Sequence, residues 1–168
     1  RARRPGPRRG GGGGGDVLTG PFSAVDHVGI TVVDLERSIG FWERLLGVAS
    51  RDRALLAGPR LGGLLGYPAG LRIDSCWIDL PGGGALELLQ YLDRDDAPYD
   101  EGTAHPGNVH LCLSVADMVA AHDRAVASGA HPVGEGPIEV PAGAHAGLKV
   151  AYLRTPDGVT LELRQYPG

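Results

Sequence analysis

The sequence predicts an α+β fold made of two similar halves, each containing a strand, a helix and two or three further strands. Three observations predict it: a strand motif that begins with His occurs twice, a strand motif that contains Glu occurs twice, and two helical stretches each end at a glycine. With 168 residues, of which 42% are hydrophobic, the chain is long enough to bury a core. Repeats this short rarely bury a face alone, so we expect the halves to pack together.

The first repeated motif opens each half. Residues 26–34 read DHVGITVVD, and residues 109–117 read VHLCLSVAD. In both copies a His opens a strand of alternating character, and an Asp follows seven residues later, where it can cap a helix. The spacing of the residues that follow predicts helices at 35–46 and at about 118–128, each ended by a glycine.

The second repeated motif closes each half. Residues 86–91 read LELLQY and residues 161–166 read LELRQY, so five of the six positions match. A turn containing glycine precedes each copy, as expected for a strand that follows a tight connection. Further strands are predicted at 71–80 and at 149–154.

The repeats also set the domain boundaries. We expect a first module at 24–92, a linker at 93–105 and a second module at 106–167. Residues 1–16, which are rich in Arg and Gly, cannot bury apolar surface and are expected to form a disordered arm.

Composition argues against several classes of protein. Five of the 16 basic residues and no acidic residue lie in residues 1–15, so residues 16–168 have 11 basic and 20 acidic residues and a net charge of −9, and nucleic acid is not an expected partner. No apolar run approaches the length of a membrane span, and no secretory signal is recognised. Cys76 and Cys112 are too few for a disulfide scaffold. We expect a cytoplasmic protein with reduced cysteines that acts on a small molecule.

Alternation along the strands sorts the side chains into two faces. The apolar residues of the opening strands face the helices, so His27 and His110 point the other way. The leucines of the closing strands belong to the core, so Glu87 and Glu162 also point away from the helices. Two His and two Glu, one of each from either half, are therefore expected on the concave side of the sheet.

These four side chains are candidate ligands for one divalent ion such as Co, Mn, Ni, Zn or Fe, since imidazole and carboxylate suit such metals. Two nitrogens and two oxygens would leave two adjacent octahedral positions for neighbouring substrate oxygens. Such chelation would stabilise an enediolate and acidify a carbon next to a carbonyl, with a carboxylate serving as base. A single His or Glu on a strand is usually structural or solvated, but here both types recur at matched positions.

The segments that begin and end the halves carry a resemblance to a known family. They are DHVGI at 26–30, Gly47, LEL at 86–88, NVH at 108–110, and YLRTPDG at 152–158 leading into LEL at 161–163. Over residues 24–167 the sequence resembles the vicinal oxygen chelate superfamily, which contains glyoxalases, bleomycin-resistance proteins and extradiol dioxygenases. The resemblance implies tandem βαβββ modules that form an open, cup-shaped mixed sheet around one metal, often in a homodimer. It assigns the metal to His27, Glu87, His110 and Glu162.

Within the superfamily, ELRQYP at 162–167 is similar to the end of methylmalonyl-CoA epimerases. Cyclitol epimerases of antibiotic biosynthesis, which act on 2-epi-5-epi-valiolone or its phosphate, are also similar. The resemblance implies a metal-dependent isomerase, with Glu162 as the preferred base and Glu87 or Asp74 as its partner. Because no basic cluster for a CoA phosphate is evident, a small α-hydroxyketone is favoured as the substrate, and methylmalonyl-CoA is the alternative. The tract 60–72 is expected to form a loop over the cup, and His145 is a candidate substrate-binding residue at its mouth.

Three other functions remain as alternatives. Lactoylglutathione lyase shares the ligand set, so only substrate turnover separates it from an epimerase. An extradiol-type dioxygenase typically uses two His and one carboxylate, so two matched glutamates count against it. A non-catalytic antibiotic-binding resistance protein often lacks the metal ligands. Because this sequence contains all four candidate ligands, that alternative is less favoured.

Overall fold

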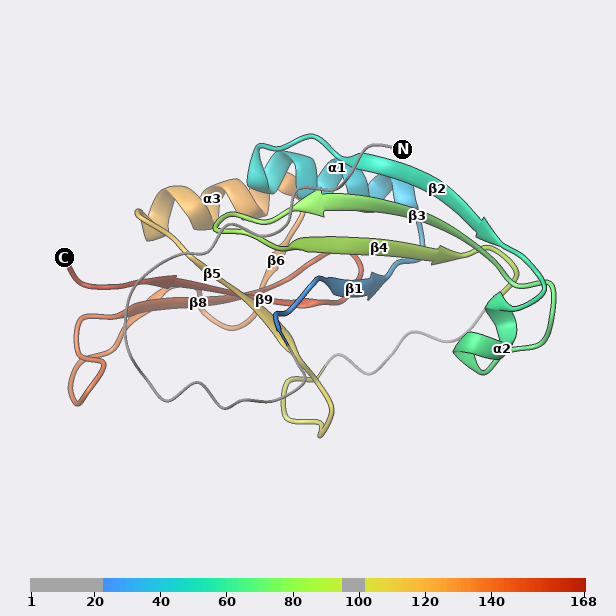
Figure 1. Cartoon of the computed structure of the whole chain (residues 1–168). Helices are drawn as coiled ribbons and strands as arrows, with labels where there is room; N and C mark the ends of the chain where they lie inside the picture. The colour runs from blue at the N-terminus through green and yellow to red at the C-terminus, as the bar shows by residue number, and fades with distance from the viewer. Residues whose placement is uncertain (1–22, 95–101) are drawn as a thin grey trace.

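The computed structural model describes residues 23–94 and 102–168 (Figure 1). Within these ranges the chain forms two mixed sheets and three helices, which confirms the predicted α+β class. The elements in chain order are β1 (Val28–Thr31), α1 (Leu35–Leu46), β2 (Arg51–Ala57), α2 (Leu61–Leu65), β3 (Arg72–Asp79), β4 (Ala85–Tyr91), β5 (His110–Ser114), α3 (Met118–Ser128), β6 (His131–Pro132), β7 (Ile138–Glu139), β8 (Lys149–Arg154) and β9 (Thr160–Gln165).

Each half of the chain builds a sheet of its own. The strand order is β1-β4-β3-β2 in the first sheet and β5-β9-β8-β6 in the second, where β7 also pairs with β8. In each sheet the opening strand runs parallel to the closing strand, β1 with β4 and β5 with β9, and the other pairs are antiparallel. Within the described residues, β1 and β5 are therefore edge strands with one unpaired side.

The two long helices begin and end at matched residues. Asp34 and Asp117 cap the first turns, and each side chain accepts a hydrogen bond from the backbone N–H three residues later, at 3.0 and 3.1 Å. Gly47 and Gly129 end the helices with φ angles of 71° and 116°, in the left-handed region that favours glycine. The helix bounds predicted from sequence are confirmed.

The repeated glutamine of each closing strand binds its own helix. Gln90 Oε1 accepts from the backbone N–H of Leu35 at 3.0 Å, and Gln165 Oε1 accepts from that of Met118 at 2.7 Å. Both N–H groups belong to a first helical turn, where no partner exists within the helix. The matched motifs therefore attach β4 to α1 and β9 to α3 in the same way.

A single core joins the two halves. Helices α1 and α3 lie side by side (Figure 1), and buried residues of both halves form one hydrophobic cluster. The helix ends are also linked: Arg44 donates to the carbonyl oxygen of Ser128 at 3.0 Å, and Arg124 donates to that of Arg44 at 2.9 Å. Because the helix-covered faces of both sheets pack on this core, the opposite faces point away from it.

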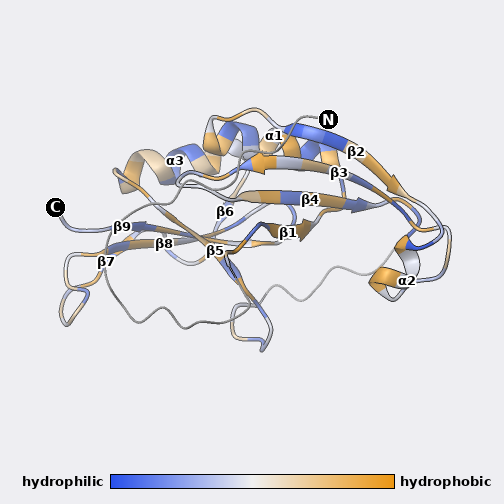
Figure 2. Ribbon diagram, in the orientation of Figure 1, coloured by the Kyte–Doolittle hydropathy of each residue, from blue (hydrophilic) through white to orange (hydrophobic). Residues whose placement is uncertain are grey.

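The tract 60–72, expected as a loop over the cup, contains a short helix. In this helix, α2, Gly62 packs so closely on Pro68 that a Cβ would overlap the Pro68 carbonyl oxygen. Figure 2 shows mainly hydrophobic colour on β1 and α2, although most of their residues are exposed.

The expected arm at 1–16 lies outside the described residues. Among the helices that are described, none is long and apolar enough to span a bilayer.

Candidate metal and substrate site

The four histidine and glutamate side chains singled out by the sequence meet as two pairs, one in each half. His27 Nε2 lies 3.3 Å from Glu87 Oε2, and His110 Nε2 lies 3.0 Å from Glu162 Oε2. Along the closing strands both glutamates alternate with leucines that are fully buried in the core. The pairs therefore lie on the sheet faces that the helices do not cover.

An aromatic ring on the next strand flanks each pair. Trp77 on β3 is the register partner of Glu87, and its ring centroid lies 5.0 Å from that of the adjacent histidine. Tyr152 on β8 is the register partner of Glu162, and its ring lies 5.8 Å from the second histidine. The internal repeat thus extends to the surroundings of both pairs.

The first pair has an additional acidic partner. Asp26 Oδ1 lies 2.8 Å from Nδ1 of His27, so this carboxylate can accept a hydrogen bond from an Nδ1 proton. Nε2, which faces Glu87, is then the ring nitrogen that can bind a metal. Asp26 and Trp77 also belong to the wall of a hollow of about 260 Å³ beside the pair. The remaining residues of that wall are Arg51, Asp79, Gly84 and Ala85.

The second pair differs in the groups around its glutamate. Cys112 and Tyr152 lie across from Glu162 on the two adjacent strands, and Arg164 Nε lies 3.6 Å from its Oε1. Burial, followed by the Glu162 charge, raises the pKa of Cys112 to about 11, and the same two causes raise the pKa of Tyr152. The Glu162 side chain is 9% exposed, against 19% for Glu87.

Sequence reasoning missed these neighbours of Glu162, although one signal could have found them. Aligning the repeats places Cys112 and Tyr152 directly across from Glu162 on the two adjacent strands. Neither residue type recurs at the matched position of the first half, so a search for repeated residues passes over both.

The two pairs do not meet within one chain. In residues 23–94 and 102–168, no three His, Cys, Asp or Glu side chains are placed to hold a metal ion together. Each pair belongs to a different sheet, and the sheets are joined through their helix-covered faces rather than by strand pairing. Each half therefore presents a half-site with one imidazole nitrogen and one carboxylate.

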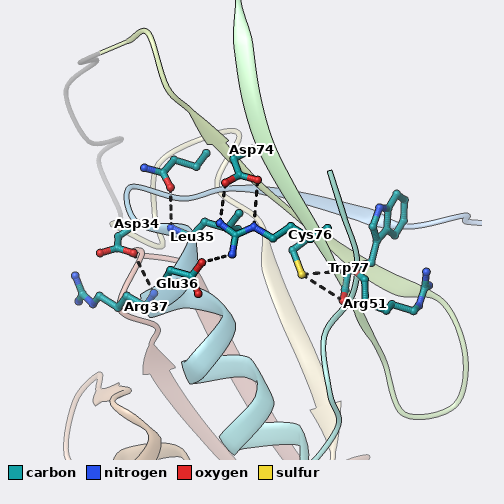
Figure 3. A network of polar contacts seen from close by, with 10 residues as sticks. Asp34, Leu35, Glu36, Arg37, Arg51, Asp74, Cys76 and Trp77 are labelled. Atoms are coloured by element: carbon teal, nitrogen blue, oxygen red, sulfur yellow. Dashed lines mark hydrogen bonds and ion pairs between the residues drawn. The ribbon is translucent and has the colours of Figure 1, made fainter. Parts of the chain in front are cut away.

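Asp74 lies apart from this arrangement. Arg53 donates to both of its carboxylate oxygens, at 2.8 and 3.4 Å, and the same guanidinium contacts Glu36 of α1 (Figure 3). Asp74 shares the strand face of Cys76, a core residue, so it lies on the helix-covered side of the sheet. Glu87 is on the opposite side, which separates the two carboxylates considered together as bases.

His145 is exposed in the loop between β7 and β8. The register places the first residue of β8 beside Gln165, at one end of the sheet, whereas His110 pairs with Thr160 at the other end. His145 therefore lies at the opposite end of these strands from His110.

Comparisons with known proteins agree with the observed fold. A family model described as the glyoxalase/bleomycin resistance protein/dioxygenase superfamily matches residues 26–152. The chain is 29% identical over 148 residues to a 2-epi-5-epi-valiolone epimerase of an Actinomyces species, covering 86% of this chain and 80% of that protein. A glyoxalase family protein from Bacillus cereus has a similar structure, with a TM-score of 0.74, 22% identity and coverage of 90% of this chain and 99% of that one. A glyoxylase/bleomycin resistance protein/dioxygenase domain from Frankia sp. EAN1pec also has a similar structure, with a TM-score of 0.61 and 23% identity. The match covers 87% of this chain and 93% of that domain.

Proposed function

Because the chain belongs to the glyoxalase/bleomycin resistance protein/dioxygenase superfamily, we propose that it is a divalent-metal-dependent epimerase acting next to the carbonyl of a small α-hydroxyketone. The observation that carries the proposal is the His–Glu pair in each half, with N–O distances of 3.3 and 3.0 Å. The similarity to a 2-epi-5-epi-valiolone epimerase supports a cyclitol ketone as the substrate.

The side chains of the half-sites fit a metal such as Co, Mn, Ni, Zn or Fe, for which imidazole and carboxylate are suitable ligands. The Asp26 carboxylate on Nδ1 of His27 is the kind of outer contact that orients a metal-binding histidine. We assign His27, Glu87, His110 and Glu162 as the residues that would hold the ion. When bound, the ion supplies Lewis acidity to neighbouring substrate oxygens.

Each pair offers only two donors, so we propose that a second copy of the chain completes the site. In a twofold dimer, the first pair of one protomer would meet the second pair of its partner, and the symmetry would create two such sites. The edge strands support this arrangement, because Val28 on β1 is 40% exposed and Val109 beside β5 is 77% exposed. Apolar edge strands readily pair with another chain.

The side chains of the protein then move the proton. A glutamate carboxylate takes the proton from the carbon next to the carbonyl, and the bond electrons remain on the substrate as an enediolate. Return of a proton from the opposite face inverts the stereocentre. Asp26 holds the orientation of His27, and the rings of Trp77 and Tyr152 form walls beside the two histidines.

Metal analysis and isotope exchange test the proposed reaction. We expect the purified protein to contain a divalent ion and, in deuterated water, to exchange the α-hydrogen of cyclitol α-hydroxyketones. A chelator should stop the exchange, and the added metal should restore it. Protein without affinity for divalent ions would contradict the proposal. Turnover of a glutathione hemithioacetal without exchange of hydroxyketones would instead make the protein a lactoylglutathione lyase.

Mixing two disabled proteins tests whether the site is shared between chains. One carries His27→Ala with Glu87→Gln, and the other carries His110→Ala with Glu162→Gln, so each alone lacks one half of every site. In a mixed dimer one site loses all four ligands, and the other is fully wild type. Random exchange of subunits should therefore restore activity to about a quarter of the wild-type sites. Absence of any recovery in dimers shown to have exchanged would contradict a shared site.

A further inference from the structure

We propose that the hollow beside the first His–Glu pair is a subsite for the hydroxyl groups of a small neutral polyol, with Arg51 and Asp79 as its specificity-determining residues. The inference rests on the proposed function and goes beyond it, because the half-sites would contact only the oxygens next to the reacting carbon. None of the four candidate metal ligands belongs to the wall of the hollow.

The hollow lies on the same sheet face as Glu87 and directly beside it. Trp77 is the register partner of Glu87, and Arg51 is in turn the register partner of Trp77, so the three side chains share one face. Asp79 follows two residues after Trp77 on β3 and belongs to this face as well. A substrate that reacts at the metal would therefore extend toward Arg51 and Asp79.

The guanidinium of Arg51 is held in place by contacts on several sides. Its Nε and Nη2 each lie 2.8 Å from Oδ1 of Asp79, and its Nη1 lies 2.6 Å from Oδ2 of Asp52. Its central carbon lies 5.6 Å from the centre of the Trp77 ring, and Figure 3 shows the two side chains next to each other. A donor that is already fixed loses little side-chain freedom when a ligand binds.

A strained backbone position sets up these contacts. Among the described residues, Asp52 is the one non-glycine residue with a positive φ angle, which is 51°. The register of β2 on β3 shifts between Arg51 and Ala54, so Asp52 lies in a bulge. Bulges redirect the neighbouring side chains, and strain of this kind is concentrated at ligand sites. The bulge therefore supports a binding role for Arg51.

The side chains of the hollow match hydroxyl groups better than an anion. A hydroxyl both donates and accepts, so adjacent hydroxyls can bind the guanidinium of Arg51 and the carboxylate of Asp79 together. Asp26 adds a second carboxylate, which gives the wall one positive and two negative side chains and disfavours a phosphate. Trp77 supplies apolar surface for ring carbons. The volume of about 260 Å³ is below that of sites for drug-sized ligands, so a small ring is the expected occupant.

The kinetics of hydrogen exchange separate binding in the hollow from the reaction. With a neutral cyclitol α-hydroxyketone, we expect Asp79→Ala and Arg51→Ala each to raise KM about tenfold and to change kcat less than about twofold. Asp74→Ala is the matched control, because Asp74 also pairs with an arginine of β2 but lies on the opposite face of β3. It should keep the wild-type KM. Wild-type KM in both Asp79→Ala and Arg51→Ala would overturn the inference.

The charge of the hollow predicts discrimination against phosphate. For the wild type, KM should be at least about tenfold higher for the phosphate ester of the ketone than for the ketone itself. Asp79→Asn keeps the shape of the side chain and removes one negative charge, so this ratio should fall several-fold, whereas Asp74→Asn should not change it. A lower KM for the ester than for the neutral ketone in the wild type would overturn the inference.

Binding without turnover distinguishes failure of the subsite from failure of the proposed reaction. Of the two tryptophans in the chain, Trp77 lines the hollow and Trp42 is buried in the core, so a ligand in the hollow should change the fluorescence of Trp77. We expect myo-inositol to do so in chelator-treated wild type, and more weakly in Asp79→Ala. A wild type that does not respond, or an equal response in Asp79→Ala, would overturn the inference even if exchange is observed. The expected response in a protein that exchanges no hydrogen would support the subsite and contradict the proposed reaction.

Discussion

The side chains of Ser38 and Asp157 meet across the two halves of the chain: Ser38 Oγ lies 2.6 Å from Oδ2 of Asp157, 119 residues away. The same hydroxyl lies 2.9 Å from the carbonyl oxygen of Asp34. Both oxygens are acceptors for the Ser38 hydroxyl, which has a single proton to donate to them. Burial is the main reason why the pKa of Asp157 is raised above its usual value of 3.8.

This pKa shift predicts a loss of stability as the pH rises. Between the unfolded and folded pKa values of Asp157, the native state binds more protons than the unfolded chain, so the free energy of unfolding falls with rising pH. The contribution is complete below 3.8 and is lost as the pH passes the folded pKa. Asp157→Asn does not titrate, so its Tm relative to the wild type should increase as the pH rises from about 4 to about 7. The exposed change Asp123→Asn is the control, and parallel Tm profiles for Asp157→Asn and wild type would contradict the prediction.

The repeated glutamines predict two equivalent losses of stability. Gln165→Leu leaves the buried N–H of Met118 without its acceptor, which should cost about 1–3 kcal/mol in denaturant unfolding. Gln90→Leu should cost a similar amount, because the same contact attaches Leu35. Gln165→Glu keeps an acceptor at the helix N-terminus and should retain most of the stability. If Gln165→Leu unfolds at the wild-type denaturant concentration, the contact does not stabilise the fold.

Two adjacent glycines in α2 offer a steric comparison. A Cβ on Gly62 would overlap the carbonyl oxygen of Pro68, whereas a Cβ on Gly63 would meet nothing within 4 Å. Gly62→Ala should therefore cost about 1–3 kcal/mol in thermal or denaturant unfolding. Gly63→Ala should be neutral or slightly stabilising, since alanine favours the helix. Equal stabilities would show that α2 does not pack on Pro68 in solution.

Asp74 is predicted to have no part in metal binding or hydrogen exchange. Asp74→Asn should keep the wild-type metal content and exchange rate, because Asp74 lies on the sheet face opposite to Glu87. Its ion pair with the half-exposed Arg53 should contribute only about 0–1 kcal/mol to stability. Exchange assays and denaturant unfolding of one preparation check both statements. Loss of exchange with full metal content would return Asp74 to the catalytic residues.

Local sequence was sufficient for the elements that depend on near neighbours. Asp34, with the glycine that follows 13 residues later, fixed the bounds of α1, because a cap acts within one turn of the helix. Residues 149–154 were predicted as a strand, and β8 has the same bounds. Alternation also separated Glu87 and Glu162 from the leucines beside them, because side chains on a strand point to opposite faces in turn.

Sequence alone therefore determined the repeat, the helices and the face of the sheet on which each histidine and glutamate lies. Only the tertiary structure decided what each face meets: α1 packs against α3, Asp74 binds Arg53, and the two His–Glu pairs remain in separate sheets. The physical reason is the separation along the chain over which each kind of interaction acts. Caps and alternation act between residues a few positions apart, whereas the packing of one sheet face against another depends on the combined burial of many residues from distant parts of the chain.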